Sequence, residues 1–198
     1  DSASACASSR CSLTSVATVT TTSGAPTADR TGYLASRYVR VLPSGSDPAP
    51  LLLWIHGGPL NSWNAWAWRW NPWLMTAKGY AVLLPDPALS TGYGRAMVQR
   101  GWGQWGGSPY TDLMAVTDEL VKRPDIDETR TAAMGGSYGG YMANWVAGHT
   151  DRFSCIVTHA SLWELVGFHG TTDHGPAWEH EMGNPYEDVS GYLDWSPR

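Results

Sequence analysis

The feature that most constrains the fold is an alternation of short strand-like runs with segments that can form helices. Continuous apolar runs of about five residues are typical of strands buried on both faces of a sheet. We predict strands over residues 51–55, 80–84, 130–134 and 154–158, and helices over 71–79, 109–123 and 138–147. Strands that alternate with helices indicate βαβ units, and therefore a mostly parallel sheet in an α/β fold.

Two segments ahead of this alternation are rich in β-branched residues. They cover residues 15–22 and 38–42, and the turn-forming sequence Ser23-Gly24-Ala25-Pro26 lies between them. We expect them to pair as an antiparallel edge of the sheet. Residues 1–13 are rich in Ser and Ala, and we interpret them as a disordered or linker tail that precedes one domain over residues 14–198.

The composition excludes several classes of protein. Only 16% of the 198 residues are charged, against roughly 25% in average soluble domains, and 12 are tryptophan. Disordered chains lack aromatic residues, and coiled coils need more charge and less glycine. No stretch of about 18 apolar residues occurs, so we expect no membrane-spanning helix. The net charge of −5, without clustered Lys and Arg, argues against a nucleic-acid partner.

The three cysteines leave the cellular compartment open. Cys6 and Cys11 lie in the N-terminal tail, either as free thiols or as a bridged pair, and no cysteine spacing matches a zinc site. Cys155 begins the apolar run Cys155-Ile156-Val157, so we expect it to be a small core residue.

Chemistry is indicated first by a G-x-S-x-G pattern at Gly135, Ser137 and Gly139. The pattern alone is weak, but here a predicted strand precedes it and a predicted helix follows it, as the nucleophile elbow of a hydrolase requires. Such a turn is so sharp that larger side chains two positions away would collide. It would lift the Ser137 hydroxyl above the sheet, beside the amide groups of a helix N-terminus.

A second glycine turn follows the first predicted parallel strand. The sequence His56-Gly57-Gly58-Pro59 places small residues where backbone N–H groups can approach a substrate carbonyl closely. Together the two turns predict a nucleophile and an oxyanion hole at one edge of the sheet.

Several segments resemble the catalytic domain of the prolyl oligopeptidase family, in its acylaminoacyl-peptidase and dipeptidyl-peptidase branch. The resemblance is carried by residues 51–59, 86–94, 100–103 and 135–142. It implies an α/β-hydrolase fold, of which residues 14–198 would be the front part, and serine-type hydrolysis of short peptides without metal or organic cofactor. In the family a β-propeller usually precedes this domain.

The resemblance also implies a role for each matching residue. Ser137 matches the nucleophile, and the backbone N–H groups of Tyr138 and Gly58 match the oxyanion hole. His56 is similar to a structural member of the glycine turn and not to the general base. The residues that would support the two turns are His56, Gly57, Gly135 and Gly139.

The remaining members of the triad are not found in the expected order. In α/β-hydrolases the acid and then the histidine follow the serine, but residues 138–198 contain only one predicted strand, so we expect a C-terminal segment outside the chain to supply both. His159 is the best candidate for a base within the chain. The alternatives are a carboxylesterase with the same machinery and a non-catalytic hydrolase-fold fragment, and we expect little or no activity from these residues alone.

Three further groups of residues have a possible functional interpretation. The tryptophans at 63, 66, 68, 70 and 73 are expected to pack as a loop beside the substrate pocket rather than to stack on a ligand. The acidic residues Glu164, Glu179 and Glu181 could attract a peptide N-terminus. The histidines at 169, 174 and 180 match no metal-binding pattern, so no metal site is predicted.

Overall fold

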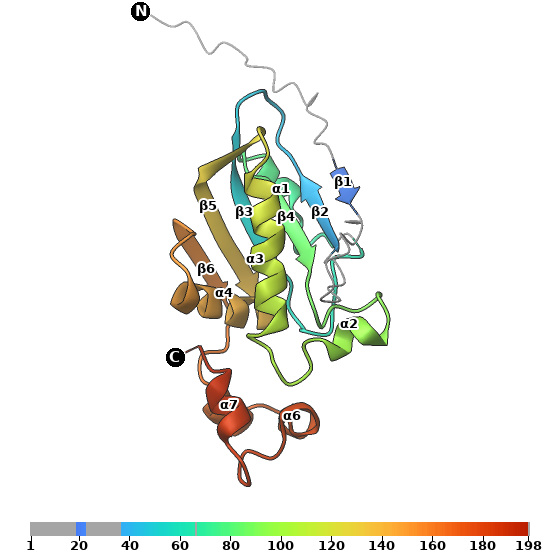
Figure 1. The fold of residues 1–198 in the computed structure, drawn as a ribbon, viewed down its shortest axis with the longest axis vertical. Coiled ribbons are helices and arrows are strands. Elements are labelled where there is room, and N and C mark those ends of the chain that lie inside the picture. Colours follow the sequence, from blue (N-terminus) through green and yellow to red (C-terminus); the bar gives the residue numbers. More distant parts are fainter. Residues whose placement is uncertain (1–18, 23–36, 66, 198) are drawn as a thin grey trace, which may run out of the picture.

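A single six-stranded sheet organises the part of the chain that the computed structural model describes, residues 19–22, 37–65 and 67–197 (Figure 1). Its strands are β1 (Val19–Thr22), β2 (Arg37–Val41), β3 (Ala49–Ile55), β4 (Ala81–Asp86), β5 (Ile126–Gly136) and β6 (Cys155–His159). Its helices are α1 (Trp73–Thr76), α2 (Arg95–Gln99), α3 (Ser108–Val121), α4 (Tyr138–His149), α5 (Leu165–His169), α6 (Gly175–Met182) and α7 (Ser190–Asp194).

The strand order is β1-β2-β4-β3-β5-β6. β1, β2 and β4 pair antiparallel, whereas β4, β3, β5 and β6 pair parallel. The predicted mostly parallel sheet with an antiparallel N-terminal edge is therefore confirmed. Of the first predicted strand only Val19–Thr22 is described, and the predicted tail with Cys6 and Cys11 lies outside the described residues.

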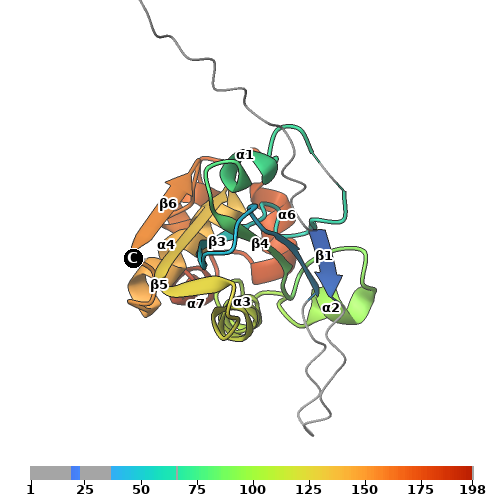
Figure 2. The same ribbon diagram turned by 90° about the horizontal axis from the view of Figure 1, so that it is seen from above.

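The central strands divide the apolar residues between two cores. Side chains alternate across a strand, so Leu53 and Ile55 of β3 join the larger core, to which α3 and α4 contribute. Leu52 and Trp54 face the opposite side, where Trp63, Trp70 and Met75 pack against them. Figure 2 shows α1 and α3 on opposite sides of the sheet, as this division requires.

The two long helices match their predictions closely, and α1 is shorter than predicted. α3 carries Leu113, Val116 and Leu120 on its buried face. In the predicted helix over 71–79 only Trp73–Thr76 is helical. The Oδ1 of Asn71 accepts the Trp73 N–H at 3.0 Å, and Gly79, with a φ of 90°, reverses the chain after the helix.

Two sequence expectations need correction. Cys155 is exposed rather than part of the core, and Val157 is 50% exposed, because among the described strands β6 pairs only with β5. The four short helices α2, α5, α6 and α7 were not predicted. In Figure 1, α6 and α7 lie beyond the carboxyl ends of the parallel strands. No helix among the described residues is long and apolar enough to cross a bilayer.

Candidate active site

Ser137 occupies the turn between β5 and α4 in a strained backbone conformation. β5 ends at Gly136, α4 begins at Tyr138, and Ser137 between them has a φ of 58° and a ψ of −122°. A positive φ of this kind costs a non-glycine residue about 1–3 kcal/mol and persists only where surrounding packing enforces it. The sequence predicts this strand-to-helix turn, and the structure has it.

Two glycines allow that turn to form. A Cβ atom at Gly135 would lie 2.3 Å from the Gly139 carbonyl oxygen, and one at Gly139 would lie 2.2 Å from the carbonyl oxygen of Ile55. Both contacts are with backbone, which has little freedom to move. Glycine is therefore required two residues before and two residues after Ser137.

The amide N–H groups of Ser137 and Tyr138 differ in whether they already have a hydrogen-bond acceptor. The Ser137 N–H donates to the His159 carbonyl oxygen at 3.0 Å, so the end of β6 already uses it. The Tyr138 N–H is the first amide of α4, and helix geometry provides no acceptor for it within the helix. It is available to an anion, and the N-terminal end of the helix dipole favours negative charge there.

The second glycine turn lies directly against the first. A Cβ atom at Gly57 would be 3.1 Å from the Gly136 carbonyl oxygen and 3.4 Å from the Cβ of Ser137. Gly58 has a φ of 133° and is followed by a cis peptide bond to Pro59. The turn after β3 and the turn after β5 therefore form one surface around Ser137.

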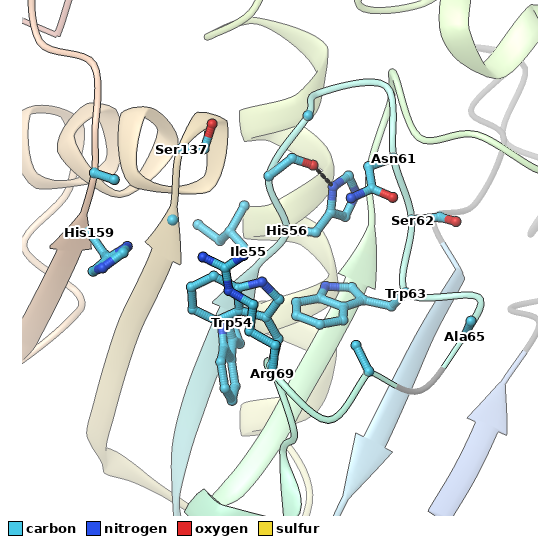
Figure 3. Close-up of a pocket in the computed structure, with 16 residues that line it drawn as sticks. Trp54, Ile55, His56, Asn61, Ser62, Trp63, Ala65, Arg69, Ser137 and His159 are labelled. Carbon is cyan, nitrogen blue, oxygen red and sulfur yellow. Dashed lines mark hydrogen bonds between the residues drawn. The ribbon is translucent and has the colours of Figure 1, made fainter.

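His56 is buried and fixed by hydrogen bonds behind this surface. Because a carbonyl oxygen can only accept, the His56 Nδ1–H donates to the Gly57 carbonyl at 2.8 Å (Figure 3). The Nε2 atom accepts from the Ser90 hydroxyl at 2.9 Å. Asp86 lies 3.7 Å from Nε2. Burial lowers the pKa of His56, although the Gly57 hydrogen bond and Asp86 oppose this. The ring is therefore held neutral, away from the Ser137 hydroxyl.

Asp86 extends this network to the tryptophan-rich loop. Its Oδ1 accepts the backbone N–H of Trp63 at 2.8 Å, and its Oδ2 accepts the Tyr93 hydroxyl. The end of β4, the glycine turn and the loop after it are thereby joined. Sequence reasoning identified His56 but missed Ser90 as its partner, since only the parallel pairing of β3 and β4 brings the ends of these strands together.

Two cavities meet at Ser137, and Gly58 and Ser137 line both. The larger has a volume of about 500 Å³, and its other lining residues are Trp54, Ile55, His56, Gly57, Asn61, Ser62, Trp63, Ala65, Ala67, Arg69, Trp70, Gly136, His159 and Ala160. The smaller has a volume of about 360 Å³, and its other lining residues are Trp105, Tyr138, Leu162, Phe168, Thr172, His174, Ala177 and Trp178.

The predicted tryptophan loop packs only in part. Trp63 and Trp70 pack edge-on against Trp54, with ring centroids 5.9 and 6.3 Å apart, and line the larger cavity. Trp68 is 93% exposed, so the packing prediction fails for it, and Trp73 is 36% exposed. Trp66 lies outside the described residues.

The three glutamates that could attract a peptide N-terminus already have hydrogen-bond partners within the protein. Glu164 caps α5 by accepting the Val166 and Gly167 amides. Glu179 pairs with the buried His169 at 3.0 Å, and Glu181 accepts from Gly103 and Trp105. Burial raises the pKa of Glu181, although these two donors oppose it. The structure gives no support for a peptide N-terminus on these carboxylates.

No described histidine or carboxylate forms a hydrogen bond with the Ser137 hydroxyl. His159 lines the larger cavity, where its ring lies edge-on to Trp70 at 5.9 Å, but it makes no such bond. Among the described residues no group of three His, Cys, Asp or Glu side chains could hold a metal ion.

Comparison with known proteins identifies the family to which the chain belongs. A model of the prolyl oligopeptidase family matches residues 66–198. The chain is 41% identical over 159 residues to the uncharacterized peptidase YuxL of Bacillus subtilis, and 40% identical over 153 residues to dipeptidyl-peptidase 5 of Aspergillus fumigatus. These matches cover 77% and 75% of the chain, but only 24% and 21% of the relatives.

The fold agrees with these matches. The structure superposes on uncomplexed acylaminoacyl peptidase of Pyrococcus horikoshii with a TM-score of 0.75 and 25% sequence identity, over 82% of this chain and 27% of that one. The sheet described above is therefore that of an α/β-hydrolase, as the sequence predicted. The chain belongs to the prolyl oligopeptidase family of serine peptidases.

Proposed function

We propose that the protein hydrolyses short peptides by acyl transfer, with Ser137 as the nucleophile. The observation that carries this proposal is the strained turn at Ser137, which two obligatory glycines maintain and against which the His56-Gly57-Gly58 turn packs. Strain of this kind at an exposed hydroxyl between two cavities has a ready explanation in catalysis. The serine oxygen would attack the peptide carbonyl, release the amine, and then give up the acyl group to water.

The oxyanion formed in that attack would be held by two backbone donors. The Tyr138 N–H begins α4 and has no helical acceptor, and the Gly58 N–H belongs to the turn that contacts Ser137. Donors of this type each contribute about 2.7–4 kcal/mol to the transition state. The Ser137 N–H is not part of this pair, because His159 already accepts it.

The smaller cavity would receive the side chain of the residue whose carbonyl is attacked. Its walls combine the aromatic side chains of Trp105, Phe168 and Trp178 with polar groups such as Thr172 and His174, and no Lys, Arg, Asp or Glu is among the residues that line it. An uncharged, apolar side chain suits such a surface.

The general base and its carboxylate would come from a segment outside these 198 residues. Within the described residues nothing bonds to the Ser137 hydroxyl, and the chain spans only about a quarter of the length of its curated relatives. A histidine oriented by a carboxylate would take the serine proton and return it to the leaving amine.

Labelling with a fluorophosphonate probe tests this mechanism. We expect the protein as its gene encodes it to be modified at Ser137, and Ser137→Ala to abolish the label. The 198-residue chain alone should react more slowly by roughly four orders of magnitude, because triad members act as a unit. A folded full-length protein that is not labelled at Ser137 would contradict the mechanism, and rapid turnover by the 198-residue chain would contradict the external base.

The same preparation separates a peptidase from an esterase. One oxyanion hole can serve both substrates, so an aminoacyl anilide and a p-nitrophenyl ester should be compared. Turnover of the ester alone would favour the carboxylesterase alternative.

A further inference from the structure

We propose that the larger cavity binds the carboxylate of the leaving peptide through Arg69, so that short peptides with a free C-terminal carboxylate are preferred. This inference rests on the proposed function, because it assigns the two cavities to the two halves of a substrate cleaved at Ser137. The leaving group is then a short peptide whose C-terminal carboxylate is free.

Arg69 has a charge that the described structure leaves unpaired. The guanidinium carbon lies 5.2 Å from the centroid of the Trp70 ring, and the group makes no hydrogen bond or ion pair with any described residue. In Figure 3 its side chain rises from the loop toward the sheet edge where Ser137 and His159 lie. The planar fork of donors on arginine matches a carboxylate in two-point contact.

The walls of the cavity leave Arg69 without a competing acid. Trp54, Trp63 and Trp70 form a packed indole cluster beside it, and Arg69 itself is exposed, so its attraction for a carboxylate is the modest one of a solvent-accessible charge. No Asp or Glu is among the residues that line the cavity. Arg69 is therefore the one permanent charge on this wall, and nothing there neutralises it.

The two cavities differ in charge on either side of the same reactive centre. Both reach Gly58 and Ser137, but only the larger has a guanidinium, and the smaller has no Lys or Arg. A peptide bond held at Ser137 would extend one half into each cavity. The half without a charge would enter the smaller cavity and the anionic end would enter the larger.

The leaving side is assigned to the larger cavity by the position of β6. His159 and Ala160, at the carboxyl end of that strand, line the larger cavity and not the smaller. In the chain order of an α/β-hydrolase the base follows the serine and therefore comes after β6, and we infer that it lies on the side where β6 ends. The base must protonate the departing amine, so base and leaving group share one side.

Peptide binding tests the assignment without requiring turnover. The protein as its gene encodes it is prepared with Ser137→Ala, and calorimetry compares an N-acetylated Phe-Ala-Ala peptide bearing either a C-terminal carboxylate or a C-terminal amide. We expect the carboxylate to bind about five- to tenfold more tightly, with the preference falling as salt is added.

Substitutions then locate the preference. Arg69→Gln should abolish it, and Arg69→Lys should keep part of it. Arg95→Gln is the matched control, because Arg95 is an exposed arginine on α2 that lines neither cavity. Thermal unfolding should show that all three variants fold as the parent does.

The outcomes separate this inference from the proposed function. Equal affinity for the two peptides, no binding of either at millimolar concentration, or a preference that survives Arg69→Gln would overturn the subsite. Labelling of Ser137 with no carboxylate preference leaves the peptidase proposal in place and removes this one. A preference that depends on Arg69, in a protein never labelled at Ser137, would show that the cavity binds a carboxylate but would overturn its assignment to a leaving group.

Discussion

β3 and β6 flank the same strand, β5, in the same parallel orientation, yet their surroundings are opposite. Six of the seven residues of β3 are buried, whereas four of the five residues of β6 are exposed. Both begin with apolar sequences, so composition does not explain the contrast. β3 has a paired strand on each side, while β6 is bordered only by β5 among the described residues. The position of a strand in the sheet thus decides burial, and Ser137 lies between a rigid side and an exposed one.

The largest expected change in unfolding free energy is at the contact between α4 and the buried strand β3. Gly139→Ala would place a Cβ atom 2.2 Å from the Ile55 carbonyl oxygen at the end of β3. Because Ile55 is buried and pairs with Gly135 of β5, its backbone has little freedom to move, and we expect a loss of at least about 4 kcal/mol of unfolding free energy, or failure to fold. Urea denaturation followed by tryptophan fluorescence measures it.

The control lies on the same helix. A Cβ atom at Gly148 meets nothing within 4 Å, so Gly148→Ala should change stability by no more than about 1 kcal/mol, and in the stabilising direction. If Gly139→Ala and Gly148→Ala change the unfolding free energy equally, α4 does not approach β3 as closely as described.

Removing side chains from the two strands compares them directly. Leu53 of β3 is fully buried, so Leu53→Ala should cost about 3 kcal/mol through lost burial and the cavity left behind. Val157 of β6 is 50% exposed, and Val157→Ala should cost less than about 1 kcal/mol. Similar losses at the two positions, measured by the same denaturation, would mean that β6 is covered in solution.

A glycine on the exposed side should be more tolerant. A Cβ atom at Gly140 would lie 2.8 Å from the His159 carbonyl oxygen and 2.7 Å from the Cβ of Ser161. The contact is also close, but in the part of the chain that the structure describes β6 pairs only with β5, so it can shift more easily. We therefore expect Gly140→Ala to cost about 2 kcal/mol, less than Gly139→Ala. A cost equal to that of Gly139→Ala would show that β6 is held as firmly as β3.

The smallest expected effect is the contribution of the buried His56 to the pH dependence of the unfolding free energy. Burial lowers the pKa of His56 below its ordinary value of 6.5, which the unfolded chain keeps. As the pH falls below 6.5, the unfolded state takes up a proton that the folded state resists, so the unfolding free energy decreases.

Replacing that histidine should flatten this dependence. We expect His56→Gln to show a shallower loss of stability between pH 7 and about pH 5, measured by denaturation at each pH. His174, whose side chain is 77% exposed, is replaced by Gln as the control for loss of an imidazole at an exposed position. A slope that His56→Gln does not alter would assign the acid sensitivity to other groups.

The sequence predicts the parts of this fold that local patterns determine. The strands around residues 51–55 and 80–84 and the helix over 109–123 carry strong periodic or continuous apolar signals, and all are present. The turn at Ser137 is predictable because steric demands place glycine at fixed positions around it. The short helices α2, α5, α6 and α7 have five to eight residues, too few for an apolar period to appear.

The features that were missed depend on contacts between distant segments. Cys155 looks like a core residue from its neighbours, and only the strand order shows that it is exposed. Ser90 is one serine among many until β3 and β4 pair and bring it to His56. Arg69 has no motif of its own. Its interest comes from the indole walls around it and from a cavity that it shares with Ser137.

The hydrogen bond from the Ser137 N–H to the His159 carbonyl oxygen joins a strained residue of the site to β6, a strand in which four of five residues are exposed. Edge strands open locally at a lower free-energy cost than central ones. When β6 frays, the amide of the nucleophile loses its acceptor, and the local exchange rate of that amide with solvent deuterium should follow the opening of β6. Any segment that pairs with the free edge of β6 would slow both the opening of β6 and the exchange of the Ser137 amide. Such a segment would control the local flexibility of the nucleophile from outside the site.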